Sequence, residues 1–191
     1  MKKKVITFSI TALIFIFSCN EEEKPSCPPP LGKMIAYVND TIEWDFKHVY
    51  FVRWSETDFA SQWADSSISI TAEFINAGCE LELTLDFHNI AQTLNKQNLV
   101  KPIFGDNQPS QLQPNSIFYT WDVDALTERF ELYEGEPAWI QLSEITEEKV
   151  SGTFQGTYVY RQSTWRFWDL PDTLRFNKVP FEAILFEPPV E

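Results

Sequence analysis

The chain has 191 residues, of which 43% are hydrophobic and 15% aromatic, and its formal net charge at pH 7 is −13. This length is typical of a single domain with a sizeable buried core. An excess of negative charge repels phosphate backbones, which argues against nucleic acid as a partner. The acidic residues are spread along the chain rather than gathered in one block, which indicates a solvated surface.

The N-terminal segment is typical of a secretory signal peptide. Lysines occupy positions 2–4, and an apolar stretch runs from Val5 to Phe17. This stretch is shorter than the roughly 20 apolar residues that a membrane-spanning helix needs. We therefore expect residues 1–18 to be removed from the mature protein.

The four residues IFSC, which end at Cys19, resemble the lipobox of bacterial lipoproteins. In that motif the cysteine is acylated and becomes the first residue of the mature chain, and two or three acyl chains anchor a protein stably where one does not. The alternative is ordinary secretion with cleavage near Ser18. Residues 20–24, NEEEK, resemble the acidic export signal of Bacteroidota surface lipoproteins, and they also fit a plain solvated tether. We expect Cys19 to attach the protein to the outer membrane, with the domain facing outward.

Residues 19–32 form the predicted tether, which is first acidic and then proline-rich and extended. Besides Cys19 the chain has two cysteines, Cys27 and Cys79. In an oxidising compartment these two can form a disulfide that fastens the tether to the domain and stabilises it by about 4 kcal/mol. The alternative is a free Cys27 in the tether and a buried Cys79 in a strand.

Residues 33–191 are predicted to form one mainly β domain, an antiparallel β-sandwich or an open barrel of about nine to eleven strands with little helix. Two strands are expected within residues 34–46 around a turn at positions 39–40. Residues 90–99 fit either a short helix or a loop, and residues 104–115 are expected to form a loop. Further strands are expected at residues 48–54, 67–74, 79–87, 116–123, 129–135, 138–145, 150–161, 164–170 and 173–185.

The clearest of these elements is the hairpin of residues 67–74 and 79–87. In its second strand Leu81, Leu83 and Leu85 alternate with acidic or polar residues. A period of two in hydrophobicity predicts a strand with one face packed and the other solvated. The intervening residues Asn76 to Gly78 are typical of a turn.

Residues 145–160, ITEEKVSGTFQGTYVY, and residues 172–185, DTLRFNKVPFEAIL, carry a family resemblance. Together with the lipobox and the segment IAYVNDTIEW, they resemble an uncharacterised family of Bacteroidota lipoproteins, over most of residues 33–186. The chain departs from that pattern at residues 177–181, where NKVPF replaces a segment with a glycine. The resemblance implies a β-sandwich on a lipid tether and, since the family has no assigned activity, no catalytic residue.

The chain carries little sign of catalytic or metal chemistry. Its two histidines, His48 and His88, are not in a zinc-binding spacing, and each fits a satisfied strand or loop residue. No GxSxG motif, glycine-rich phosphate loop or calcium-binding loop is present in the sequence. We expect no metal, no cofactor and no enzymatic activity. A glycosidase that uses two carboxylates on facing strands remains an alternative.

Aromatic residues are abundant, with 7 Trp, 6 Tyr and 16 Phe. In the segment TWRFWDL, Trp165 lies on one face of the expected strand, and Arg166 and Trp168 lie on the other. Both faces cannot be core in a two-sheet sandwich, so one of these tryptophans is expected to be exposed and to stack on a sugar or a partner protein. Trp54 and Trp63, on either side of a polar stretch, are weaker binding candidates.

The alternative interpretation is that most aromatic side chains, Trp44, Trp121 and Trp139 included, fill the core. Thr41 and Thr173 each follow an aspartate and precede an aliphatic residue, and they resemble the O-glycosylation site of Bacteroidota. The sequence therefore predicts a lipid-anchored, non-catalytic binding module for a glycan or an envelope protein. A structural subunit of a surface complex is the second hypothesis, and a carboxylate-pair hydrolase is the third.

Overall fold

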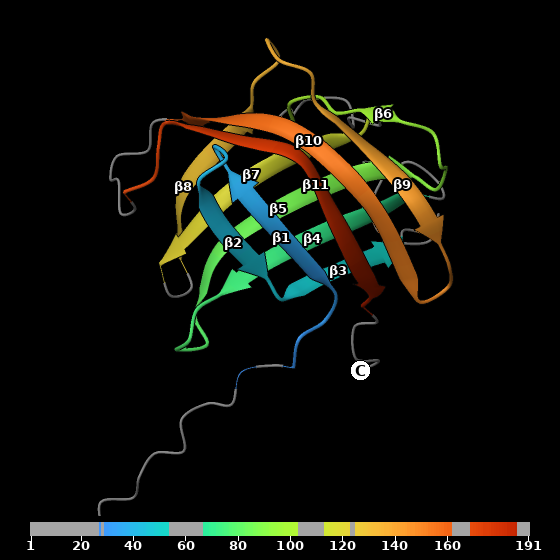
Figure 1. The fold of residues 1–191 in the computed structure, drawn as a ribbon, viewed down its shortest axis with the longest axis horizontal. Coiled ribbons are helices and arrows are strands. Elements are labelled where there is room, and N and C mark those ends of the chain that lie inside the picture. The colour runs from blue at the N-terminus through green and yellow to red at the C-terminus, as the bar shows by residue number, and fades with distance from the viewer. Residues whose placement is uncertain are drawn as a thin grey trace, which may run out of the picture.

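The computed structural model describes residues 27, 29–53, 67–102, 113–122, 125–161 and 169–186 (Figure 1). Over these residues the chain forms eleven strands and no helix, which confirms the prediction of a mainly β fold. No helix long and apolar enough to cross a membrane occurs in the described ranges. The strands are β1 (Lys33–Val38), β2 (Ile42–Phe46), β3 (His48–Arg53), β4 (Ser67–Ile75), β5 (Leu81–Ala91), β6 (Gln97–Asn98), β7 (Asn115–Asp122), β8 (Ala125–Leu132), β9 (Trp139–Ile145), β10 (Lys149–Arg161) and β11 (Thr173–Leu185).

The strands form one sheet that folds over itself into two layers. Their order is β2-β1-β11-β3-β4-β5-β7-β8-β10-β9-β6, and β10 also pairs with β11. In Figure 1 a front sheet of β2, β1, β11, β10 and β9 covers a back sheet of β3, β4, β5, β7 and β8. β10 and β11 join the layers, because β10 pairs with both β9 and β8, and β11 pairs with both β1 and β3.

All strand pairs are antiparallel except β3 with β11, which are parallel over the register Ile184↔Tyr50. Only Lys47 separates β2 from β3, so the chain passes from the front sheet to the back sheet without reversing direction. β2 is antiparallel to β1, and β1 is antiparallel to β11. β3 therefore reaches β11 in the parallel sense, a detail that the prediction of an antiparallel sandwich did not include.

The core lies between the two sheets and is built mostly from aromatic rings. The Trp44 ring stacks on that of Phe118, with 5.5 Å between centroids and 9° between planes. Trp121 and Trp139, expected in the core, are only half-buried. Interior rings of this size remove a large apolar area from water and dominate the stability of such a sandwich. The largest fully buried rings belong to Phe46, Phe51, Phe87, Phe118, Phe130, Phe154, Tyr158 and Phe176.

The middle of the chain resolves one open choice of the sequence analysis. Residues 90–99 form no helix: β5 continues to Ala91, a bend follows, and the two-residue strand β6 pairs with β9. The expected strand at 164–170 and the expected loop at 104–115 fall largely outside the described residues. Residues 169–170 belong to no strand.

Candidate functional site

The structure places only some of the residues that the sequence singled out. Cys19 and the five binding candidates lie outside the described residues; the five are Trp54, Trp63, Trp165, Arg166 and Trp168. Thr41 is exposed in the turn between β1 and β2, and Thr173 is half-buried at the start of β11. The two threonines lie at the same end of the front sheet, because the side chain of Asn39 donates a hydrogen bond to the carbonyl oxygen of Thr173 at 2.9 Å.

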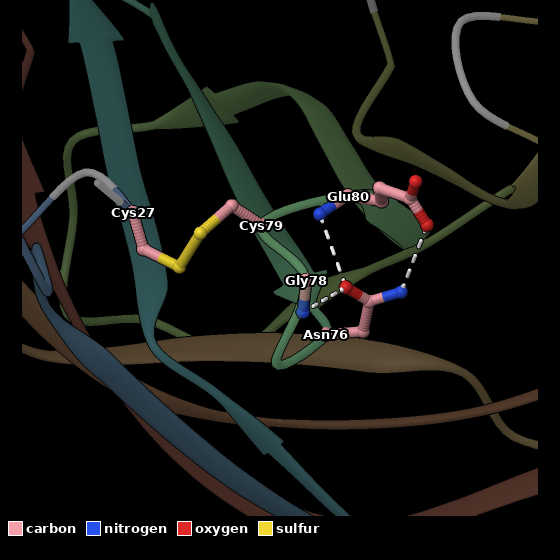
Figure 2. The surroundings of a disulfide bond; sticks show 5 residues. All are labelled: Cys27, Asn76, Gly78, Cys79 and Glu80. Atoms are coloured by element: carbon pink, nitrogen blue, oxygen red, sulfur yellow. Dashed lines mark hydrogen bonds between the residues drawn. A yellow bond between two sulfur atoms is a disulfide. The ribbon is translucent and has the colours of Figure 1, made fainter. Parts of the chain in front are cut away.

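Cys27 and Cys79 are joined by a disulfide, with 5.0 Å between their Cα atoms (Figure 2). The β4–β5 turn that carries Cys79 is shaped by Asn76. The Oδ1 atom of Asn76 accepts hydrogen bonds from the backbone N–H groups of Gly78 (2.7 Å) and Glu80 (3.1 Å). This turn holds Cys79 at a φ of 68° and presents it to the tether. The disulfide therefore fastens the tether to the back sheet at the β4–β5 turn.

A second attachment holds the end of the tether where it enters the fold. The backbone N–H of Leu31 donates to the carbonyl of Lys47 at 2.8 Å, and its carbonyl accepts from Val49. Gly32 has a φ of 70°, and a Cβ atom there would lie 2.5 Å from the carbonyl oxygen of Glu182. Only glycine fits this position between β3 and β11. The tether therefore joins the folded domain at a fixed position, beside β3 and β11.

The outer face of the front sheet carries two hollows, which together we call the front groove. The larger one, of about 380 Å³, is lined by β1, β9, β10 and β11, and the smaller one, of about 340 Å³, by β1, β11 and the β1–β2 turn. Ile35 and Pro180 line both hollows. Ile35 is 47% exposed, and Tyr37, in the smaller hollow, is 55% exposed. Large apolar side chains are thus left uncovered along β1.

A bulge in β11 creates this groove. The register between the strands runs from Met34↔Phe181 to Val38↔Phe176, so β11 uses one more residue than β1 over this stretch. The extra residue bends the strand, and Lys178 adopts a φ of 50°. Pro180 has no backbone N–H to offer a neighbouring strand, so a bulge is where it is tolerated. The sequence signal for this feature was the segment NKVPF at residues 177–181, where a glycine was expected.

Gly152 forms part of the lining of the larger hollow. It lies opposite Phe181 in the β10–β11 ladder. A Cβ atom on Gly152 would come within 2.8 Å of the Phe181 ring and 2.5 Å of the carbonyl oxygen of Gln141. The phenylalanine ring therefore fills the space that the absent side chain leaves, which keeps this part of the sheet closely packed.

The smaller hollow is bordered by a turn that is held firmly in place. The turn comprises residues 39–41, since Val38 pairs with Ile42, and the φ values of Asn39 and Asp40, 52° and 59°, are typical of a type I′ turn. The side chain of Asn39 accepts a hydrogen bond from the backbone N–H of Arg175 at 2.9 Å. Tyr37 lies opposite Glu43 across β1 and β2, and a hydrogen bond to the Glu43 carboxylate raises the pKa of the Tyr37 hydroxyl.

A second polar surface lies on the outer face of the back sheet, and we call it the back polar row. It comprises Tyr50, Thr71, Glu73, Asp86, His88 and Tyr119. Thr71 donates a hydrogen bond to the Asp86 carboxylate at 2.8 Å, and Tyr50 donates to Glu73 at 3.0 Å. His88 Nδ1 lies 3.2 Å from the Ser69 hydroxyl. Side chains of the row therefore serve as hydrogen-bond partners for one another.

The side chains of the back polar row are half-buried. Burial raises the pKa of Asp86 from 3.8 to about 6, against the lowering effect of the Thr71 hydrogen bond and with a smaller contribution from the Glu73 charge. Burial lowers the pKa of His88 to about 4 and raises that of Tyr119 to about 12. The polar face of β5, expected to be solvated, is therefore only partly so: Glu80 is exposed, Asp86 is half-buried and Thr84 is buried.

A group of charges surrounds Glu131 on β8. Its carboxylate, only 5% exposed, accepts from Lys101 (2.5 Å), Arg129 (2.8 Å) and Arg161 (2.8 Å). Burial acts to raise the pKa of Glu131, but the hydrogen bonds from Lys101 and Arg161 outweigh it and hold the pKa below its ordinary value. This cluster ties β8 to β10 and to the segment before β7, which is a structural role.

The described residues offer no arrangement typical of a metal centre, since no group of three His, Cys, Asp or Glu side chains among them could hold an ion. A further cavity of about 500 Å³ lies at the tether, between Cys27 and the β4–β5 turn. Neither Asp86 nor Glu73 lines this cavity or the front groove. No family model, no curated protein and no solved structure matches the chain. Its function therefore has to be argued from these surfaces.

Proposed function

We propose that this protein is a lipid-anchored lipoprotein of the outer membrane, exposed at the cell surface, which acts as a non-catalytic binding module. Cys19 carries the acyl anchor in this proposal, residues 20–26 form the free part of the tether, and the front groove is the binding surface. The observation that carries the proposal is the placement of the smaller hollow of this groove relative to the tether.

The tether and the smaller hollow of the front groove lie at opposite ends of β1. In Figure 1 β1 begins beside the tether and runs toward the turn with β2. Tyr37 is four residues beyond Lys33, where β1 begins, so it lies about 13 Å further along the strand. A domain held at the tether end exposes the β1–β2 end of its front sheet to the surroundings. An anchored receptor needs this arrangement.

The second hypothesis, a structural subunit of a surface complex, uses the same groove as a protein interface. Ile35 and Tyr37 are large side chains that are left exposed in this groove. Exposed apolar surface is typical of a site that contacts another molecule, and both hypotheses share this feature. The carboxylate-pair hydrolase has less support, because Asp86 and Glu73 are bonded to neighbours and line none of the cavities described.

The anchor is tested with the full chain, expressed with its own leader in a Bacteroidota host. The native protein is expected to incorporate an alkyne-labelled fatty acid and to fractionate with the outer membrane, and Cys19→Ser is expected to lose both properties. A Cys19→Ser protein that stays in the membrane fraction would contradict the anchor. Protease digestion of intact cells then reports whether the domain faces outward.

The binding surface is tested in the same cells by replacing Tyr37 with a photo-crosslinking phenylalanine analogue. Tyr133 is the matched control, because it is also exposed (46%) but lies beyond the end of β8, away from the front groove. We expect a covalent adduct from position 37 and none from position 133. Equal labelling at both positions, or none at 37, would contradict a binding role for the front groove.

A further inference from the structure

The smaller hollow of the front groove shows what kind of ligand it suits, given that the front groove is the binding surface as proposed above. Its lining residues are Ile35, Tyr37, Asp40, Asn177, Lys178, Val179 and Pro180. We propose that this hollow binds one sugar ring of a neutral glycan, stacked on Tyr37. Three features of the hollow lead to this assignment.

The first feature is the aromatic ring itself. Tyr37 is 55% exposed and lies on β1 opposite Glu43 of the neighbouring strand β2. Its ring offers a flat apolar surface to the C–H face of a pyranose, while the hydroxyl groups of the sugar point away toward polar neighbours.

The second feature is the variety of polar groups around that ring. Asp40 supplies a carboxylate that only accepts hydrogen bonds, Lys178 an ammonium that only donates them, and Asn177 an amide that does both. All three residues are exposed at the edge of the hollow. A sugar hydroxyl both donates and accepts, so a ring that carries several of them matches all three groups at once. The rim carries one carboxylate and one ammonium group, so a strongly charged ligand would be repelled by one of the two. A neutral ligand therefore suits the hollow better.

The third feature argues against an extended peptide as the occupant. Peptides commonly bind to sheets by adding a strand to a free edge. The hollow lies on the face of the sheet, where β1 pairs with β2 from Met34 to Val38 on one side and with β11 at Lys33, Met34 and Val38 on the other. β1 therefore lies between two strands and presents no free edge to a new strand. The volume of about 340 Å³ is at the small end of the range for ligand sites and suits a single ring better than a folded partner.

The experiment uses the mature lipidated chain in micelles of a detergent without a sugar headgroup. Saturation-transfer NMR is recorded with a panel of methyl glycosides of the common neutral hexoses and N-acetylhexosamines at about millimolar concentration. We expect at least one glycoside to receive saturation, strongest on the ring protons of one face. Tyr37→Ala is expected to weaken its binding about tenfold, and Tyr37→Phe, which keeps the ring, to leave it within about threefold.

Two further variants control for folding and for the polar contacts. Tyr133→Ala removes an exposed tyrosine elsewhere and is expected to change nothing. Lys178→Gly keeps the backbone φ of 50° accessible and removes the whole side chain with its ammonium group, so it is expected to weaken binding without unfolding the chain. Circular dichroism spectra of all four variants check that the sheet is intact.

The outcomes separate this inference from the proposed function. If no glycoside binds, or if Tyr37→Ala binds as well as the native chain, the sugar site is wrong. A protein adduct from position 37 in cells would then still support the front groove as a protein-binding surface. If position 37 gives no adduct and no glycoside binds, both proposals fail together.

Discussion

Asp86 and His88 lie two residues apart on β5, and burial shifts their pKa values in opposite directions. We predict that their effects on the pH dependence of stability nearly cancel in the native protein. Replacing one of the two residues should therefore reveal the effect of the other on the pH dependence of stability. Asp86→Asn and His88→Gln are the two substitutions, because each removes a titration and keeps a polar side chain.

The sign of each effect follows from proton binding. Folded Asp86 has a pKa of about 6 against 3.8 when exposed, so between these pH values the folded chain binds more protons and stability falls as pH rises. Folded His88 has a pKa of about 4 against 6.5, so the unfolded chain binds more protons and stability rises with pH over that window. Each difference corresponds to about 3 kcal/mol of unfolding free energy over its full window.

The assay is urea denaturation followed by tryptophan fluorescence at pH 4, 5, 6 and 7. Relative to the native chain, Asp86→Asn should become progressively more stable as pH rises, by about 3 kcal/mol between pH 4 and pH 7. His88→Gln should show the reverse slope, with its relative stability greatest near pH 4. Only the slopes are interpreted, because loss of the Ser69 contact adds a constant offset. Differences that do not change with pH would refute the claim that these groups are desolvated in the folded state.

Three further predictions test the packing and the cross-links. A double Cys27→Ser, Cys79→Ser variant should lose about 4 kcal/mol of unfolding free energy in urea, since the disulfide spans 52 residues, and reducing agent should not destabilise it further. Gly152→Ala should lower the melting temperature in calorimetry much more than Gly156→Ala, because the first new Cβ would meet a backbone oxygen at 2.5 Å and the second only side-chain atoms, of which the nearest is a leucine methyl at 3.2 Å. Glu131→Gln should cost about 3 kcal/mol in urea denaturation, since three cations would be left around a neutral group, and an unchanged midpoint would argue against the charge cluster.

Strand positions were predictable because they depend on local patterns. Alternation in residues 67–74 and 79–87 predicted β4 and β5, and the residues between them formed the expected turn. The last strand was predicted at residues 173–185, the bounds that it has in the structure. In each case a hydrophobic period of two is interrupted by turn residues such as Asn and Gly, and both signals are set by neighbouring residues.

The candidate site was not predictable in the same way, because it depends on contacts between distant segments. The front groove results from one extra residue in β11 opposite β1, more than a hundred positions away in the chain. The segment NKVPF is unusual for a strand, but nothing in the local sequence places it beside Ile35 and Tyr37. The aromatic residues that it did select lie outside the described residues, so their role stays a prediction.

Three tyrosines on the outer faces of the two sheets show why composition alone could not identify a binding surface. Tyr50 and Tyr119 flank the carboxylate of Asp86, and burial, the main cause, together with that charge raises the pKa of both hydroxyls. Tyr37 has the same side chain on the same kind of face, yet it is 55% exposed; it lies opposite Glu43 on the edge strand β2 and beside the bulge in β11. All three occupy alternating positions of a strand, so local pattern cannot separate them. The three tyrosines differ in which strand lies beside them and in whether that strand is regular. Only the exposed ring of Tyr37 can exchange water for a ligand.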